Sequence, residues 1–379
     1  MSREEVGITG DVPAAPNDRF RILSVDGGGM RGLIPALVIA DLERRLKEGA
    51  GADARVADYF HMFAGTSTGG LVALSLTVPD LPSRPQRPLI SAGELAELYT
   101  TDGGKIFHRS LWQKLRTLWG WAGPKYGSKA LAEAVTRNFG TEARIADALR
   151  EVVVVAYDMT DREPYFFKRW RARETEARNR PLVDAALATS AAPTYFPSHE
   201  VDGHALVDGG VFAANPTIAA IVEALKRRSD EPHDLAPDDL LVVSVGTGLH
   251  ETNFTQAEVS RWGKLGWILP KEGEPPILAT VLGGASDGVD HWTQTLVNEP
   301  PSPDLPVEEV GRGPRFFRLQ VSLDPPIQMD DTSPTALSAL EGAAKRLVSE
   351  HEAELADIAA RLLRAGPIPP DPPAAAAQS

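Results

Sequence analysis

Apolar residues in this chain gather in short continuous runs, and segments with the spacing of helices separate these runs. The runs that predict buried strands are FRILSV (20–25), the end of VADYFHMFAG (56–65), EVVVVAYDM (151–159) and LLVVSVGTG (240–248). Residues 31–49 and 68–78 follow the first two runs and carry the pattern of helices. Strands that alternate with helices predict an α/β fold of three layers, in which a central, mostly parallel sheet has helices on both faces.

The two ends of the chain differ from this pattern. Residues 1–18 and residues 366–379 are rich in proline and alanine, so both ends are predicted to be disordered. No internal repeat lies between them, and the proline-rich stretches 79–88 and 300–306 have the character of loops rather than of domain linkers. We therefore expect one large domain over residues 19–365.

The composition excludes several classes of protein. The chain has 379 residues and no cysteine, which excludes a disulfide framework, a cysteine-bound zinc site and thiol catalysis. Its net charge of −13 argues against binding to a nucleic-acid polymer. The start lacks the apolar core of a signal peptide, and no apolar run approaches the ~18 residues of a membrane span, so we expect a cytoplasmic protein. Carboxylates and histidines lack metal-ligand spacing, so neither a metal nor another cofactor is expected.

The first candidate for chemistry is GTSTGG (65–70), which lies between an apolar run and a predicted helix. In a G-x-S-x-G sequence in this context, the serine occupies a strained turn that exposes its hydroxyl group. Gly65 and Gly69 supply the room that lets such a turn pack closely. The helix after Ser67 would direct backbone N–H groups and the positive end of its dipole toward a developing oxyanion. The pattern indicates a nucleophilic serine at position 67.

A second glycine-rich turn, DGGGMRG (26–32), follows the first predicted strand. Consecutive glycines before a helix N-terminus let backbone N–H groups converge on one point, which is a geometry that binds anions. Two interpretations remain open here: an oxyanion hole for a tetrahedral acyl intermediate, or a cradle for a nucleotide phosphate. Neither the P-loop pattern nor G-x-G-x-x-G is present. The residues concerned are Gly27, Gly28 and Gly29, with Arg31 as an adjacent positive charge.

The third candidate is Asp208, at the end of a predicted hairpin. Asp202 and Gly203 between two short apolar stretches form a hairpin-turn signature, and the returning strand ends at Asp208 and two glycines. An activated serine needs a group that takes its proton. Either Asp208 acts alone, or one of the two histidines beside the hairpin turn, His199 and His204, completes a triad.

Two residues near these motifs have structural interpretations. His61 comes just before the apolar end of the second predicted strand, and we expect it to be a core histidine with a hydrogen-bond partner. Asp26 ends the first predicted strand beside Gly27. We expect it to orient the glycine-rich loop through hydrogen bonds to the backbone.

In this order, DGGGMRG, GTSTGG and VDGG resemble the motifs of patatin-like phospholipases. The likeness extends to ATSAAPTYFP, NPTIAA, VVSVGTG and MDDTSPTALSALE, and it covers roughly residues 20–350. The resemblance implies a patatin-type α/β core with a partly helical cap, and a serine–aspartate dyad that hydrolyses lipid acyl esters without a metal. It makes Ser67 the nucleophile and Asp208 the base. Gly27, Gly28 and Gly29 match the oxyanion-hole glycines of the family, and Arg31 matches its basic position.

Such a dyad has a physical requirement, because a free aspartate with a pKa of ~3.9 is a poor base for a serine hydroxyl. Burial in a poorly hydrated site would raise the pKa of Asp208. The predicted function is hydrolysis of acyl esters of phospholipids or related lipids through an acyl-Ser67 intermediate. Two alternatives stay open: an acyltransferase with the same acyl-enzyme, and a nucleotide- or phosphate-binding regulatory protein that uses DGGGMRG.

The partners of the protein are less sharply defined by the sequence. Some bacterial members of the family are switched on by a signalling nucleotide, so a small-molecule activator is one option that the resemblance implies. The oligomeric state, the preferred headgroup and the cleaved acyl position stay open.

Residues 105–129 reverse the charge of the chain locally, because they contain six Lys or Arg and no Asp or Glu. Trp112 and Trp119 fall with leucines on one face of a possible helix, opposite basic residues such as Lys114 and Arg116. This pattern is typical of a helix at a membrane interface, although a helix that faces the core fits it equally well. We expect peripheral contact with the inner face of the membrane through this segment. A second aromatic segment, residues 261–270, is expected to belong to the same cap.

Overall fold

The computed structural model describes residues 18–81, 83–106, 126–226, 235–249, 254–269, 276–298 and 314–370. Within these residues, eight strands form one sheet in the order β10-β9-β1-β2-β5-β8-β7, and β6 also pairs with β5. The strands are β1 (Phe20–Val25), β2 (Met62–Thr66), β5 (Glu151–Asp158), β6 (Glu163–Lys168), β7 (His199–Val201), β8 (His204–Asp208), β9 (Leu240–Val245) and β10 (Phe316–Leu319). A separate pair consists of β3 (Pro79–Asp80) and β4 (Arg84–Pro88).

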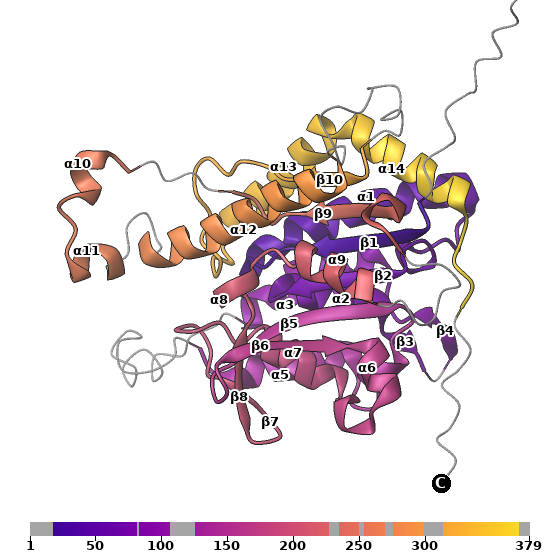
Figure 1. Ribbon diagram of the computed structural model, residues 1–379, viewed down its shortest axis with the longest axis horizontal. Helices are drawn as coiled ribbons and strands as arrows, with labels where there is room; N and C mark the ends of the chain where they lie inside the picture. Colours follow the sequence, from indigo (N-terminus) through magenta and orange to yellow (C-terminus); the bar gives the residue numbers. More distant parts are fainter. Residues whose placement is uncertain are drawn as a thin grey trace, which may run out of the picture.

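Helices cover both faces of the sheet (Figure 1). On one face lies the larger apolar cluster, which includes residues of α1 (Leu33–Ala50), α2 (Thr68–Thr77), α3 (Ala92–Ile106), α5 (Ser128–Phe139), α7 (Leu182–Thr189), α13 (Pro334–Glu350) and α14 (Glu352–Ala365). The other face packs against α9 (Thr217–Lys226) and α12 (Pro276–Val297). Shorter helices are α6 (Arg169–Glu174), α8 (Gly210–Ala213), α10 (Gln256–Val259) and α11 (Lys264–Ile268).

The side chains of β1 explain why the sheet is buried on both faces. Leu23 and Val25 belong to the larger apolar cluster, whereas Phe20 and Ile22 belong to the smaller cluster with α9. Successive side chains of a strand point to opposite faces, so a continuous apolar run supplies both layers of the core. Neighbouring pairs among β10, β9, β1, β2 and β5 are parallel, and β6, β7 and β8 pair in the antiparallel sense. The predicted three-layer α/β fold is confirmed.

The register of the sheet brings two distant motifs together. Thr66, the last residue of β2, pairs with Val155, and the next residue of β5, Ala156, pairs with Asp208 of β8. The chain therefore leaves β2 at Ser67 beside the position where β8 ends. A parallel and an antiparallel neighbour of β5 thus deliver a hydroxyl and a carboxylate to one place.

The C-terminal stretch packs against the domain beyond the end of α14. Ile368 donates its N–H to the Asp58 carbonyl at 2.7 Å, and its own carbonyl accepts from Nη2 of Arg150 at 2.7 Å. Arg21 Nη1 donates to the carbonyl of Gly366 at 2.9 Å. Residues 366 and 368, which lie beyond the predicted boundary at residue 365, therefore pack against the domain.

Two expectations about membranes meet different outcomes. Residues 107–125, which include Trp112, Lys114, Arg116 and Trp119, lie outside the described residues, so the basic segment stays a prediction. Among the helices that the structure describes, none is long and apolar enough to cross a membrane.

Candidate active site

Ser67 occupies the turn between β2 and α2 with φ 56° and ψ −126°. A positive φ is unusual for a residue with a side chain and is commonly found at functional sites. A serine at a helix N-cap usually accepts a hydrogen bond from the first turn of the helix, but Ser67 makes no such cap. Its side chain instead lies close enough to the Asp208 carboxylate to lower the pKa of that group.

The buried side chain of Thr189 holds this turn in place. The N–H of Ser67 donates to Oγ1 of Thr189 at 2.8 Å, and the Thr189 hydroxyl donates to the carbonyl of Val155 at 2.6 Å. Thr189 is completely buried at the end of α7. The strained backbone of Ser67 is therefore tied through one side chain to the strand that also pairs with Asp208.

The two glycines of the turn are required by backbone contact. A β-carbon on Gly65 would lie 2.1 Å from the carbonyl oxygen of Gly69, and one on Gly69 would lie 2.1 Å from that of Val25. Both distances are far below van der Waals contact. The end of β1, the end of β2 and the start of α2 therefore pack backbone against backbone around Ser67.

Asp208 is 5% exposed and lies at the end of β8. Burial raises the pKa of its carboxyl group to about 6, although the nearby Ser67 side chain and the N–H of Gly210 act in the opposite direction. The Gly210 N–H lies 2.7 Å from Oδ1 of Asp208. Asp208 is thus ionised at neutral pH but is a much stronger proton acceptor than a solvated aspartate.

The three glycines of the DGGG turn differ in what their amides do. The N–H of Gly27 donates to the carbonyl of Ala214 at 2.9 Å, whereas those of Gly28 and Gly29 donate to no acceptor within the described part of the chain. A β-carbon on Gly27 would lie 3.3 Å from that of Ser67. Gly27 therefore leaves room beside the serine, and the two following amides stay available to a ligand.

Three residues outside the glycine run hold the DGGG loop in place. Gly29 has φ +58°, and a β-carbon there would lie 2.2 Å from the carbonyl oxygen of Met329. The Thr247 hydroxyl donates to the carbonyl of Gly27 at 2.7 Å, and Nε of Arg31 donates to that of Gly28 at 3.4 Å. The carbonyl groups of Gly27 and Gly28 therefore both accept hydrogen bonds from side chains. The N–H groups of Gly28 and Gly29 have no acceptor in the described part of the chain.

Asp26 holds the loop by a different interaction from the one expected. Its carboxylate forms a two-point ion pair with Arg318 of β10, with N–O distances of 3.0 and 2.6 Å. Within the described residues, this carboxylate accepts no hydrogen bond from the backbone. The expectation of backbone hydrogen bonds was therefore wrong, because a buried carboxylate is better compensated by a guanidinium.

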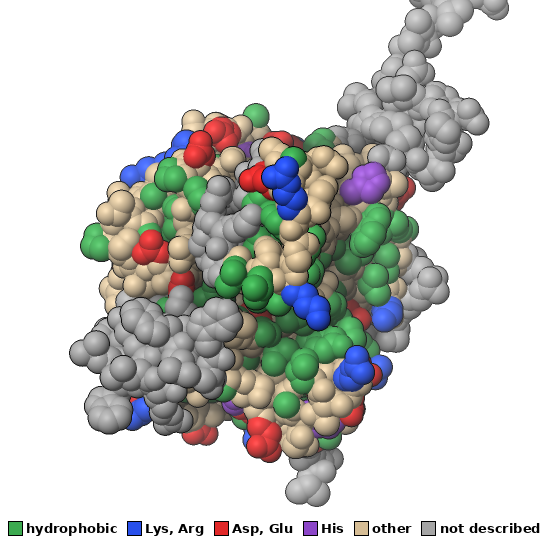
Figure 2. Space-filling view, turned by 90° about the vertical axis from the view of Figure 1, so that its left-hand side faces the viewer, with side chains coloured by type: hydrophobic (Ala, Val, Ile, Leu, Met, Phe, Trp, Pro, Cys, Tyr) green, Lys and Arg blue, Asp and Glu red, His purple; other side chains and the backbone are tan. Residues whose placement is uncertain are grey.

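A cavity of about 370 Å³ adjoins Ser67 and the DGGG loop. Its wall is mainly apolar and comes from α2, α3, α5 and the loops after α7, β8 and β10, with Leu71, Leu95, Leu98, Leu131, Val135, Phe139 and Phe196 among its residues. Figure 2 views the molecule from the side on which α10 and α11 lie in Figure 1 and shows hydrophobic side chains gathered over this face. The cavity therefore joins the polar groups around Ser67 to a mainly apolar wall.

The second aromatic segment lies behind this wall. Phe254 and Pro276 line the cavity, whereas none of the described residues 261–269 does. Trp262 packs edge-on against Phe254 at 4.7 Å between ring centroids and against Trp267 at 5.2 Å. The described residues 261–269 thus contribute to the cavity only through Phe254, against which Trp262 packs.

Comparison with known proteins decides the family. A family model described as patatin-like phospholipase matches residues 23–221. Patatin-like protein 1 of Oryza sativa subsp. indica is 36% identical over 75% of this chain and 72% of its own length. Patatin-like protein 2 of Arabidopsis thaliana is 38% identical over 73% of this chain and 72% of its own length. This chain belongs to the patatin-like phospholipase family. Membership supports a lipid acyl hydrolase activity.

Family membership alone leaves the activity of an individual patatin-like chain open. A protein described as probable inactive patatin-3-Kuras 1 of Solanum tuberosum is 32% identical over 68% of this chain and 71% of its own length. The crystal structure of VipD from Legionella pneumophila matches with 13% identity and a TM-score of 0.36 over 89% of this chain and 68% of that one, which is too distant to add to the argument. Whether a chain of this family is active therefore depends on the residues of its site.

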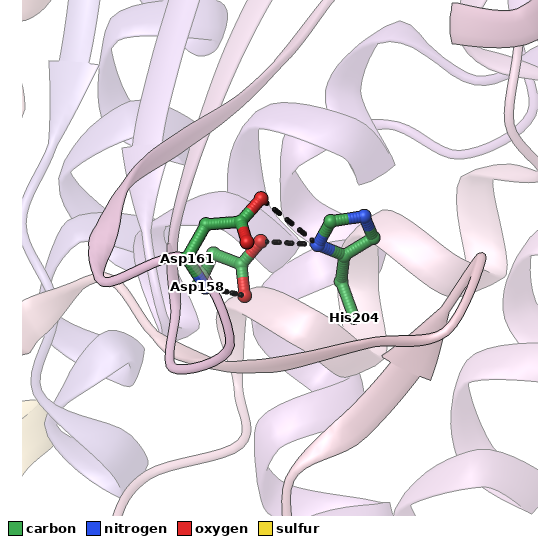
Figure 3. A group of neighbouring side chains, drawn as sticks. All are labelled: Asp158, Asp161 and His204. Carbon is green, nitrogen blue, oxygen red and sulfur yellow. Dashed lines mark hydrogen bonds and ion pairs between the residues drawn. The ribbon is translucent and has the colours of Figure 1, made fainter.

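The two histidines beside the hairpin turn have other partners in this patatin-like chain. Nδ1 of His204 lies 2.7 Å from Asp158 and 3.5 Å from Asp161 (Figure 3). Nε2 of His199 lies 2.9 Å from Asp184. His204 also begins the strand that Asp208 ends, and four residues of extended chain span about 13 Å. Neither histidine completes a triad in this structure.

Asp158, Asp161 and His204, drawn in Figure 3, stabilise the turn between β5 and β6. The ligand atoms of Asp158, Asp161 and His204 lie within 4.8 Å of one another, as a metal site would require. Oδ1 of Asp158 already accepts from the N–H groups of Thr160 and Asp161, at 2.8 and 3.3 Å, and its other oxygen is bonded to His204. The three side chains thus satisfy one another at the turn between β5 and β6.

Sequence reasoning missed the residues that support the site. Thr189, Thr247 and Arg318 contact residues that are far away in the sequence, so no local pattern marks them. Thr189 and Thr247 lie in ATSAAPTYFP and VVSVGTG, two of the stretches that resemble the family, so only that resemblance could have drawn attention to them. His61 has the expected hydrogen-bond partner, because its Nδ1 accepts from the N–H of Arg21 at 3.0 Å, but it is half-buried rather than part of the core.

Proposed function

We propose that this protein is a serine lipid acyl hydrolase of the phospholipase A type, which cleaves acyl esters of phospholipids or related lipids through an acyl-Ser67 intermediate. The observation that carries the proposal is the strained Ser67, whose side chain lies beside a buried carboxylate with a pKa of about 6. A serine with an ordinary structural role needs neither the strain nor this partner.

Two protons pass through Asp208 during the reaction, one in each half. Oγ of Ser67 attacks the ester carbonyl carbon while its proton passes to the Asp208 carboxylate. When the tetrahedral intermediate collapses, the bond to the lipid alcohol breaks, and the alcohol leaves with the proton from Asp208. Water then attacks the acyl-Ser67 ester and gives its proton to Asp208, and the second collapse returns that proton to Ser67 and releases the fatty acid.

The negative charge of each intermediate would be stabilised by the DGGG loop. The amides of Gly28 and Gly29 are the proposed donors, because that of Gly27 is already bonded to Ala214. A donor of this kind typically contributes about 3 kcal/mol to the barrier reduction. Arg31 contacts the carbonyl of Gly28 and adds positive charge on the same side.

The same loop suits a nucleotide phosphate less well. The carboxylate of Asp208 lines the cavity and would repel a phosphate group. The apolar wall instead matches an acyl chain. Acyl transfer shares every step up to the acyl-enzyme. It differs from hydrolysis only in that another alcohol, instead of water, attacks the acyl-Ser67 ester.

The experiment is mass spectrometry of a membrane lipid extract incubated with the wild-type protein and with Ser67→Ala. Free fatty acid and a matching lysolipid should appear with the wild type alone. Newly acylated alcohols in place of free acid would favour an acyltransferase. No change in any lipid, together with nucleotide binding by the folded protein, would favour the regulatory alternative.

A further inference from the structure

A buried polar network lies directly behind the DGGG loop. Nη1 and Nη2 of Arg318 donate to the two carboxylate oxygens of Asp26, at 3.0 and 2.6 Å, and Asp26 is the residue before Gly27. Nε of the same guanidinium donates to Oδ2 of Asp290 on α12 at 2.9 Å. One side chain of β10 therefore joins the end of β1 to a helix on the face of the sheet.

The geometry of this network is specific for arginine. Nη1 of Arg318 also donates to Oγ of Ser244 at 3.0 Å, and Nη2 also donates to Oγ of Ser286 at 3.4 Å. These bonds and the three to the carboxylates use all five N–H donors of the guanidinium, and its side chain is 13% exposed. A lysine ammonium keeps the charge but presents its donors from one atom, so it cannot span the same partners.

The network also reaches the loop by a second route. Oδ1 of Asp290 accepts from Nδ2 of Asn215 at 2.8 Å. The residue before Asn215 is Ala214, whose carbonyl accepts the N–H of Gly27. Asp26 and Gly27 are thus both held by groups that meet at Asp290 and Arg318, immediately before the two amides of Gly28 and Gly29.

We propose that Arg318 is a positioning residue of the reaction. By joining Asp26 to Asp290 it fixes the start of the DGGG loop, and it thereby holds the amides of Gly28 and Gly29 where the oxyanion forms. Arg318 does not line the cavity itself, whereas Asp26 and Ser286 do. The inference rests on the proposed function, because it assigns a cause to the geometry of that oxyanion site.

The test compares Arg318→Lys with Arg169→Lys. Arg169 is a matched control because it is also buried and also pairs with a carboxylate, that of Glu151 at 3.2 Å, at the opposite end of β5 from the site. Both variants should lose thermal stability. Arg318→Lys should also lower kcat for a soluble p-nitrophenyl ester about 10- to 100-fold with KM within about twofold, whereas Arg169→Lys should keep both constants within about twofold.

A double variant separates positioning from general damage. If Arg318 acts through the loop, Arg318→Lys should lower kcat much less in the Gly28→Ala background than it does in the wild-type protein. A folded Arg318→Lys protein with wild-type kcat would overturn the proposal. So would multiplicative effects, or an equal loss of kcat in Arg169→Lys.

A second variant covers the case in which Arg318→Lys does not fold. Asp26→Asn keeps the shape of the side chain but removes its charge and one acceptor, and it should show the same selective loss of kcat. Wild-type turnover by folded Asp26→Asn protein would overturn the proposal. A wild-type protein with no esterase activity and no fluorophosphonate labelling would refute the proposed function and this inference with it. Active wild type with unaffected variants would refute this inference alone.

Discussion

At the scale of single residues, Ser67 and Asp208 form a pair in which the carboxylate must be ionised before it can accept a proton. Because the pKa of Asp208 is raised to about 6, it is charged above that pH and protonated below it. We expect kcat/KM for a soluble ester to be constant above about pH 7 and to fall tenfold per unit well below pH 6. A midpoint near pH 4 would indicate a solvated carboxylate instead. Since a histidine also titrates near pH 6, His199→Ala and His204→Ala serve as controls, and both should keep the wild-type midpoint.

Asp208→Asn should separate activity from stability. Without a base, kcat should fall by roughly a thousandfold or more. The fold should become more stable at pH 8, because the raised pKa of Asp208 means that its ionised form destabilises the folded state. That penalty is absent below the unfolded value of 3.8 and complete above the folded value of about 6.

Urea unfolding of Asp208→Asn and wild type at pH 8 and pH 5 measures this effect. The gain in free energy of unfolding should reach about 3 kcal/mol at most at pH 8 and fall to about half of that at pH 5. A variant that is less stable than wild type at pH 8 would contradict the buried, destabilised carboxylate.

At the scale of elements, Thr189 connects α7, β5 and the serine turn. Thr189→Val keeps the shape of the side chain but leaves the N–H of Ser67 and the carbonyl of Val155 without their partner. We expect a loss of about 1–3 kcal/mol in the free energy of unfolding and a lower kcat. Thr189→Ser retains the hydroxyl and should retain most of both quantities. Equal behaviour of the two variants would show that the hydroxyl does not hold the turn.

The junction of β1, β2 and α2 leaves no room at Gly65. Gly65→Ala should lower the free energy of unfolding by about 3 kcal/mol, because its methyl group would meet backbone atoms that cannot move independently. Gly342→Ala in α13 is the control. Its β-carbon has no neighbour closer than 3.9 Å, so it should be neutral or stabilising by up to about 1 kcal/mol. Thermal unfolding that ranks the two variants in the reverse order would contradict the close backbone contact.

At the scale of the whole molecule, local sequence patterns predicted the layers and singled out Ser67 and Asp208, the two residues that the proposed function makes nucleophile and base. Continuous apolar runs mark β1, β2, β5 and β9 because strands buried on both faces need no polar positions. Ser67 and Asp208 stood out because strand–turn–helix and hairpin signatures are local. Their proximity depends on how β2 and β8 pair with β5, which no local pattern indicates. Before the structure, only the resemblance to a family implied that the two residues form a dyad.

Other parts of the molecule could not be predicted in this way. Arg318 meets Asp26 across the sheet from a strand almost three hundred residues later, and nothing near either residue indicates the pair. The different use of the Gly27 amide depends on Ala214, which belongs to another loop. Residues 366–370 have the composition of a disordered tail, yet their carbonyls compensate buried arginines. Each case is a long-range polar contact, which periodicity does not encode.

The central claim is that catalysis passes through an acyl group on Ser67. The most direct measurement is peptide mass spectrometry of protein that is quenched in acid during turnover of a p-nitrophenyl ester. The account predicts one added acyl group, carried by the peptide that contains Ser67, and neither adduct nor turnover in folded Ser67→Ala protein. Undiminished hydrolysis by folded Ser67→Ala, or an acyl group on another residue, would contradict it.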